Sequence, residues 1–157
     1  MEYLILKWLH ILSATLLFGT GIGSAFYKLM TDRSGNIQAI AQTNKLVVLA
    51  DWLFTTPTII LQPITGVWLA IILGYTLTSS WLVLSLILYI VAGLCWLPVV
   101  LMQIRMRNLA QLAIKQHHPL DKHYAHLARI WFWLGIPAFT ALLGVYYLMV
   151  FKPTLWN

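Results

Sequence analysis

The sequence predicts an all-α protein, a four-helix transmembrane bundle in one domain over residues 1–157. Hydrophobic residues make up 61% of the chain and charged residues 9%, which lies outside the composition of water-soluble domains. Four apolar stretches each exceed the about 20 helical residues that cross a hydrocarbon core. They lie at residues 1–30, 46–75, 81–104 and 129–151. Most of the positive charge lies in two of the connections between them.

The positive charge is distributed asymmetrically. The two basic connections, Thr31–Thr43 and Lys115–Lys122, have in or beside them eight of the ten Lys and Arg: Lys28, Arg33, Lys45, Arg105, Arg107, Lys115, Lys122 and Arg129. The turn Thr76–Ser80 has no charge. Because Lys and Arg concentrate in cytoplasmic loops, we predict a multi-pass protein of the cytoplasmic membrane with both termini outside. The net charge of +6 then reflects topology, and no nucleic acid partner is expected.

The first apolar stretch is expected to be a retained helix, because its apolar run exceeds the roughly 7–15 residues of a signal peptide. One face of this helix combines a histidine with mostly small residues at spacings of three and four: His10, Ala14, Leu17, Gly21, Ser24 and Ala25. Imidazole is a common axial ligand of haem iron, and small side chains leave room for a flat macrocycle. The alternative is structural: Gly19 and Gly23 are typical of close helix packing, and a lone histidine can bond to a neighbouring helix.

The second stretch has a polar stripe at helical spacing, formed by Asp51, Thr55, Thr58, Gln62 and Thr65. Ionisable and polar groups inside a membrane are often functional, so Asp51 and Gln62 are the candidate catalytic residues. The alternative for Asp51 is a helix-start residue attracted to the helix dipole and to Lys45. Pro57 and Pro63 interrupt the helix hydrogen bonds beside the stripe.

The depths of these groups in the membrane place them in one predicted pocket. At a rise of about 1.5 Å per residue, His10 lies roughly 10 Å below the outer boundary. The second stretch reaches this depth near Thr65, and the third stretch, residues 81–104, reaches it near Tyr89. The predicted cofactor-binding residues are His10, as the ligand of the haem iron, and Ala14, Gly21, Thr65 and Tyr89.

The connection before the last stretch, residues 129–151, contains four histidines and an aspartate: His117, His118, His123, His126 and Asp121. His123 and His126 share a helical face and could chelate a divalent ion weakly. The alternative is contact of a basic juxtamembrane segment with anionic lipid headgroups. Cys95 has no partner for a disulfide and is interpreted as an apolar filler.

Four segments carry a resemblance to known proteins: Trp8–Ile11, Val48–Pro57, Gln62–Gly66 and Trp96–Val100. They resemble a family of predicted bacterial integral membrane proteins, over nearly the whole chain. That family is similar, more distantly, to HemJ-type protoporphyrinogen oxidases, which implies haem b bound through His10. Where the HemJ pattern has a lysine in the third helix this chain has Ser85, and where it has an acidic residue in the last helix this chain has Gly135 and Ile136.

The combined prediction is a membrane-embedded haem b-binding protein with a redox or electron-transfer role, and an oxidoreductase activity is one possibility that it includes. Its partners would be the lipid bilayer, further copies of itself and a redox partner. One alternative is a non-enzymatic subunit or assembly factor of a membrane complex, in which the glycines of the first helix are a docking surface. Another is a proton or small-solute carrier along Asp51–Thr65. No nucleophile, base and orienting group occur together, which argues against a hydrolase.

Overall fold

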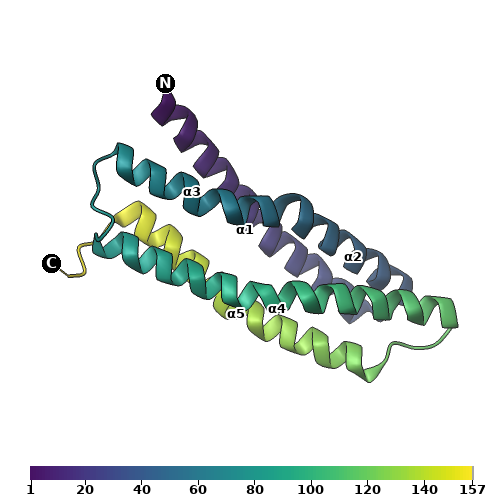
Figure 1. Cartoon of the computed structure of the whole chain (residues 1–157). Coiled ribbons are helices and arrows are strands. Elements are labelled where there is room, and N and C mark those ends of the chain that lie inside the picture. Colours follow the sequence, from purple (N-terminus) through teal and green to yellow (C-terminus); the bar gives the residue numbers. More distant parts are fainter. Residues whose placement is uncertain (157) are drawn as a thin grey trace.

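The computed structural model describes residues 1–156 and confirms the predicted all-α, four-helix architecture. Asn157, the last residue of the predicted domain, lies outside the described residues. The elements are α1 (Glu2–Ser34), α2 (Ile37–Ala50), a π-helical turn η1 (Asp51–Thr55), α3 (Thr56–Ile72), α4 (Ser80–Gln116) and α5 (Lys122–Phe151). Because α2, η1 and α3 follow each other without a break, they form one long helix, Ile37–Ile72 (Figure 1).

The helices are longer than the apolar stretches, and the predicted bounds of the two polar connections were wrong. Helix α1 continues to Ser34, and α2 begins at Ile37 after Gly35, whose φ of 68° lets the chain leave the helix. The Asn36 side chain accepts a hydrogen bond from the Ala39 N–H and so begins α2. The polar residues of Thr31–Thr43 predicted a loop. In the structure most of them lie in the last turn of α1 and the first turns of α2.

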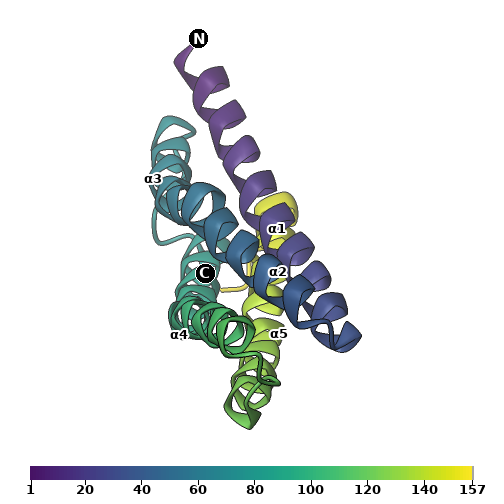
Figure 2. The ribbon, with the colours of Figure 1, turned by 90° about the vertical axis from the view of Figure 1, so that its right-hand side faces the viewer.

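The two ends of the bundle differ in what they contain. Both termini and the turn between α3 and α4 lie at one end, and the α1–α2 and α4–α5 connections lie at the other (Figure 1). Helix α1 crosses the α2–α3 helix obliquely, whereas α4 packs along α5 (Figure 2). At Gly144 of α5 an added Cβ would lie 2.9 Å from Leu88 Cδ1, so this glycine permits the close approach of α4.

The glycines of α1 do not pack against another helix of the same chain, although small-xxx-small spacing is typical of close helix packing. A Cβ added at Gly19, Gly21 or Gly23 would meet no atom within 4 Å, so none of these residues brings another helix of the chain close. Helix α1 is held by other contacts, including those of the buried side chains of Leu17 and Lys28.

Large apolar side chains cover the outer surface of the helices. Leu94 is 64% exposed, Ile71 61% and Val150 72%. Each of the four long helices contains a segment apolar enough to cross a membrane, and such side chains would then face lipid. The main cluster of buried side chains lies where α2, α4 and α5 meet, around Ile40, Met106 and Trp131.

Candidate functional site

His10 of α1 bonds to Thr65 of α3, and this contact orients the imidazole. The Thr65 hydroxyl donates to the Leu61 carbonyl at 2.7 Å, one turn earlier in its own helix. Because the Thr65 hydroxyl proton is used in this bond, Thr65 Oγ1 accepts a hydrogen bond from His10 Nδ1–H, at 2.8 Å. Among residues 1–156 the opposite nitrogen, Nε2, has no hydrogen-bond partner. A neutral imidazole with Nδ1 protonated and Nε2 free is the form that ligates a metal.

The backbone around His10 is held by Gln62, also from α3. The Gln62 amide nitrogen donates to the His10 carbonyl at 2.8 Å and to Ser13 Oγ at 2.6 Å. Gly66, one turn further along α3, lies against the imidazole ring, because an added Cβ would be 3.2 Å from His10 Cε1. Two residues of the predicted polar stripe, Gln62 and Thr65, therefore face α1, and they fix the main chain and the ring of His10.

Tyr89 joins α4 to the same region through a carbonyl that proline releases. Pro63 has no N–H, so it cannot bond to the Ile59 carbonyl four residues earlier. The Tyr89 hydroxyl donates to this carbonyl at 2.6 Å. Pro63 therefore leaves the Ile59 carbonyl without a partner in its own helix, and Tyr89, which lies at its predicted depth, donates a hydrogen bond to that carbonyl.

These residues border a cavity of about 480 Å³, which we call the outer cavity because it opens toward the end with both termini. Its lining includes His10, Ala14, Gln62, Gly66 and Tyr89. Cavities of about 300–1,000 Å³ are typical of sites for small molecules and cofactors.

Two lysines from the ends of the chain also line the outer cavity, Lys7 and Lys152. Lys152 Nζ donates to the Tyr75 hydroxyl at 2.9 Å and lies 5.6 Å from the centre of the Trp81 ring. Two lysines therefore border the cavity, whereas the small apolar residues Ala14 and Gly66 form part of its wall.

A second, inner cavity of about 680 Å³ lies deeper, between α1, η1, α4 and α5. Asp51 and Gly21 line it, and Leu17, Tyr89 and Leu142 line both cavities. Asp51 is 5% exposed and accepts a hydrogen bond from the Thr55 hydroxyl at 2.9 Å.

The position of Asp51 follows from the π-helical turn. Its carbonyl accepts from the N–H of Thr56, five residues later, and from the Thr56 hydroxyl at 2.9 Å. Pro57, which has no N–H to offer, follows directly and favours this irregular turn. Single π-helical turns within α-helices are frequent at functional sites.

The single predicted pocket is therefore two adjoining cavities. His10, Ala14, Gln62 and Tyr89 lie together around the outer cavity, with Thr65 behind the imidazole, as their depths predicted. Gly21 and Asp51 line the inner cavity. Gly21 lies eleven positions after His10 on α1 and lines the inner cavity, not the outer one. The roles predicted for these residues stay predictions.

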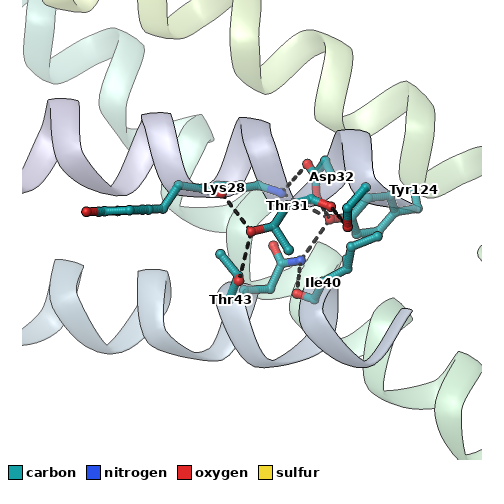
Figure 3. Close-up of polar contacts among 9 residues, drawn as sticks. Lys28, Thr31, Asp32, Ile40, Thr43 and Tyr124 are labelled. Carbon is teal, nitrogen blue, oxygen red and sulfur yellow. Dashed lines mark hydrogen bonds and ion pairs between the residues drawn. The ribbon is translucent and has the colours of Figure 1, made fainter. Parts of the chain in front are cut away.

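The structure also contains a buried polar cluster that sequence reasoning missed, formed by Lys28, Asp32, Asn44 and Tyr124 (Figure 3). Lys28 is 0% exposed and donates to Asp32 at 2.8 Å and to the Tyr124 hydroxyl at 3.0 Å. That hydroxyl donates to Asp32 at 2.6 Å and accepts from the Asn44 amide at 2.8 Å. The cluster connects α1, α2 and α5, so Lys28 is not one of the exposed charges of the connection. The spacing of Lys28 and Asp32 by four residues was the available signal.

The four histidines of the α4–α5 connection and the start of α5 are all exposed. In the part of the chain that the structure describes, no three His, Cys, Asp or Glu residues come together as a metal site. Weak chelation by a pair such as His123 and His126, and contact of the segment with anionic headgroups, both stay predictions.

The sequence pattern of the chain matches one family. The profile of the family described as "Predicted integral membrane protein (DUF2269)" matches residues 4–153. No curated protein and no solved structure matches the chain. The profile spans the four long helices and both cavities, so the expectation of an integral membrane protein family is confirmed. The chain belongs to the DUF2269 family of predicted integral membrane proteins.

Proposed function

We propose that this integral membrane protein binds haem b through His10 Nε2 and has a redox or electron-transfer role in the bacterial inner membrane. The observation that carries the proposal is the orientation of the imidazole. Thr65 accepts a hydrogen bond from Nδ1–H, and Nε2 has no partner among residues 1–156 beside a cavity of about 480 Å³. Metal-ligating histidines commonly hold their other ring N–H in such a hydrogen bond.

The residues around the outer cavity fit haem b. Ala14 and Gly66 offer a wall of small apolar residues for a flat macrocycle, and Tyr89 adds an aromatic side. Lys7 and Lys152 at the mouth suit the two carboxylates that haem b carries. Gln62 and Ser13 hold the backbone of His10, so the ligand would be preorganised. Bound haem would supply the one-electron redox centre.

The resemblance to HemJ-type proteins supports haem binding through His10, and the departures from that pattern limit what is proposed. Ser85 lines a small cavity of about 50 Å³ together with His10, and its hydroxyl donates to the Trp81 carbonyl at 2.6 Å. Gly135 lines the inner cavity. Neither residue offers the ionisable group of the HemJ pattern, so electron transfer, and not protoporphyrinogen oxidation, is the role proposed.

The first test is the colour of the protein. Purified in detergent from haem-replete cells, it is expected to show a Soret band. A variant that changes both His123 and His126 to alanine should keep the band, since these exposed residues lie in the first two turns of α5, beside the connection. A colourless parent protein would reject the haem proposal and favour a non-enzymatic subunit or a carrier.

We also propose that copies of the chain associate and that a redox partner docks on them. Gly19 and Gly23 lie four positions apart on one face of α1, and a Cβ added at either would meet no atom within 4 Å. Small residues of this kind let helices of different chains approach in a membrane. If haem is absent, the same face is the docking surface of a structural subunit.

The orientation in the membrane is a separate prediction. A reporter that is active only in the cytoplasm should be active when inserted near Gly35 or Gln116 and silent when fused to the C-terminus. The reason is that the exposed Lys and Arg gather at the end that holds the α1–α2 and α4–α5 connections (Figure 1). An active C-terminal fusion would reverse the orientation.

A further inference from the structure

The inner cavity opens toward the surroundings between α1 and α5, and both sides of this opening are apolar. Ile22 and Phe26 of α1 and Phe132 and Ile136 of α5 line the cavity and are also between 40% and 57% exposed. A residue that both lines a cavity and is exposed lies at its opening. In a membrane such apolar side chains face lipid, so a molecule can enter the cavity from the bilayer.

Each side of the opening continues into an arginine. On α1 the lining residues Ile22, Phe26 and Leu29 recur at helical spacing, and Arg33 follows one turn after Leu29. On α5 Arg129 lies one turn before the lining residue Phe132. Both arginines are exposed. They extend the two sides of the opening toward the end with the α1–α2 and α4–α5 connections, which is predicted to be cytoplasmic.

Contacts between α1 and α5 bring the two segments with these arginines together. Asp32, the neighbour of Arg33, accepts a hydrogen bond from the Tyr124 hydroxyl at 2.6 Å. Lys28 Nζ lies 5.2 Å from the centre of the Trp131 ring, so residues 28–33 lie beside residues 124–131. The salt bridge found among residues 1–156 joins Lys28 to Asp32, and no carboxylate of this part of the chain forms one with either arginine.

These features define the chemistry of a ligand: an apolar chain for the cavity and an anionic head for the arginines. The cavity of about 680 Å³ lies within the about 300–1,000 Å³ of typical ligand sites. A membrane helix of a second copy, about 10–12 Å across and about 30 Å long, would fill more than about 2,000 Å³. A single lipid chain therefore fits the cavity better than a helix does.

We propose that the inner cavity holds one acyl chain of an anionic phospholipid, whose phosphate is bound by Arg33 and Arg129. The guanidinium group pairs with phosphate through two parallel hydrogen bonds, and basic pockets between membrane helices on the cytoplasmic side bind anionic headgroups. The proposal does not depend on haem, because His10 lines the outer cavity and not the inner one.

The test uses dioleoyl phosphatidylglycerol and dioleoyl phosphatidylcholine as probes, which have the same chains and differ in headgroup charge. Native mass spectrometry of the delipidated protein in detergent measures binding. The parent should bind the anionic lipid about 25-fold more tightly, because each basic residue near an anionic headgroup contributes about fivefold. Arg33→Gln combined with Arg129→Gln should bind the two lipids equally.

A second variant tests the cavity itself. A Cβ added at Gly135, which lines the inner cavity, would meet no atom within 4 Å, so Gly135→Leu extends a side chain into the cavity without a clash at the Cβ. This variant should lose the binding of both lipids. Circular dichroism checks that it remains folded.

The matched control is Lys45→Gln combined with Lys115→Gln. It removes two charges from exposed positions at the same end of the bundle, and neither lies within one turn of a residue that lines the inner cavity. This variant should keep the preference for the anionic lipid. His10→Ala should keep it too, so failure of the haem proposal is distinguishable from failure of this one.

Three results would overturn the proposal. The first is a parent that binds neither lipid or binds both equally. The second is an arginine double variant that keeps the preference of the parent. The third is competition by glycerol 3-phosphate as strong as that of the anionic lipid, which would reduce the site to one for phosphate alone. If the parent binds no lipid and Gly135→Leu changes its oligomeric mass, the cavity is an interface between copies of the chain.

Discussion

The His10→Ala variant is expected to lose the Soret band of the purified protein while remaining a folded helical bundle. The reason is that His10 is the only histidine that lines either cavity, and its Nε2 is the atom that the Thr65 contact leaves free. Absorption spectra of parent and variant, normalised to protein, measure the loss, and circular dichroism with size-exclusion chromatography checks the fold. Imidazole added to His10→Gly should restore part of the band by replacing the missing ligand.

Two further variants separate ligation from packing. Thr65→Val removes the acceptor of the Nδ1 proton and is expected to weaken haem affinity by about 10–100-fold, the usual effect of losing such a partner. Gly66→Ala would place a Cβ 3.2 Å from His10 Cε1 and should shift the ring and the spectrum. If His10→Ala keeps the band of the parent, the histidine is a structural residue and its bond to Thr65 only joins two helices.

Lys28→Met is expected to give the largest loss of stability among single substitutions at the end with the two connections. The variant leaves the Asp32 carboxylate without its cation inside the cluster, next to the Tyr124 hydroxyl. Removing one partner of a buried ion pair lowers the free energy of unfolding by about 3–5 kcal/mol, mainly because the other charge stays unpaired. Unfolding by sodium dodecyl sulfate in mixed micelles, followed by circular dichroism, measures the change.

The control for Lys28→Met is Lys45→Met, which removes the same charge from an exposed position of α2 at the same end of the bundle. It should change the free energy of unfolding by no more than about 0.5 kcal/mol. The double variant Lys28→Met with Asp32→Asn should recover part of the loss, because it leaves no unpaired charge. Equal effects of Lys28→Met and Lys45→Met would show that the cluster does not stabilise the contact of α1 with α5.

Much of the architecture could be predicted because it depends on local properties. Apolar runs longer than a bilayer requires predicted four spans, and helical spacing predicted that Asp51, Gln62 and Thr65 share a stripe. The rise per residue placed Thr65 and Tyr89 at the depth of His10, where the structure brings them. The helix bounds were less predictable, since a helix continues beyond the apolar segment wherever caps such as Asn36 satisfy its end.

The sequence by itself determined which segments are helical and apolar, which connections are basic and which polar residues lie on each helix, because each of these follows from neighbours along the chain. Only the tertiary structure decided how those faces pair. Lys28 and Tyr124 are 96 residues apart, and His10 and Thr65 are 55 apart. The burial of a lysine, the free nitrogen of a histidine and the division of one expected pocket into two cavities all depend on such distant partners. The spacing of residues along the chain does not predict these partners. It shows which face of a helix a polar side chain lies on, but not which group on another helix forms its hydrogen bond.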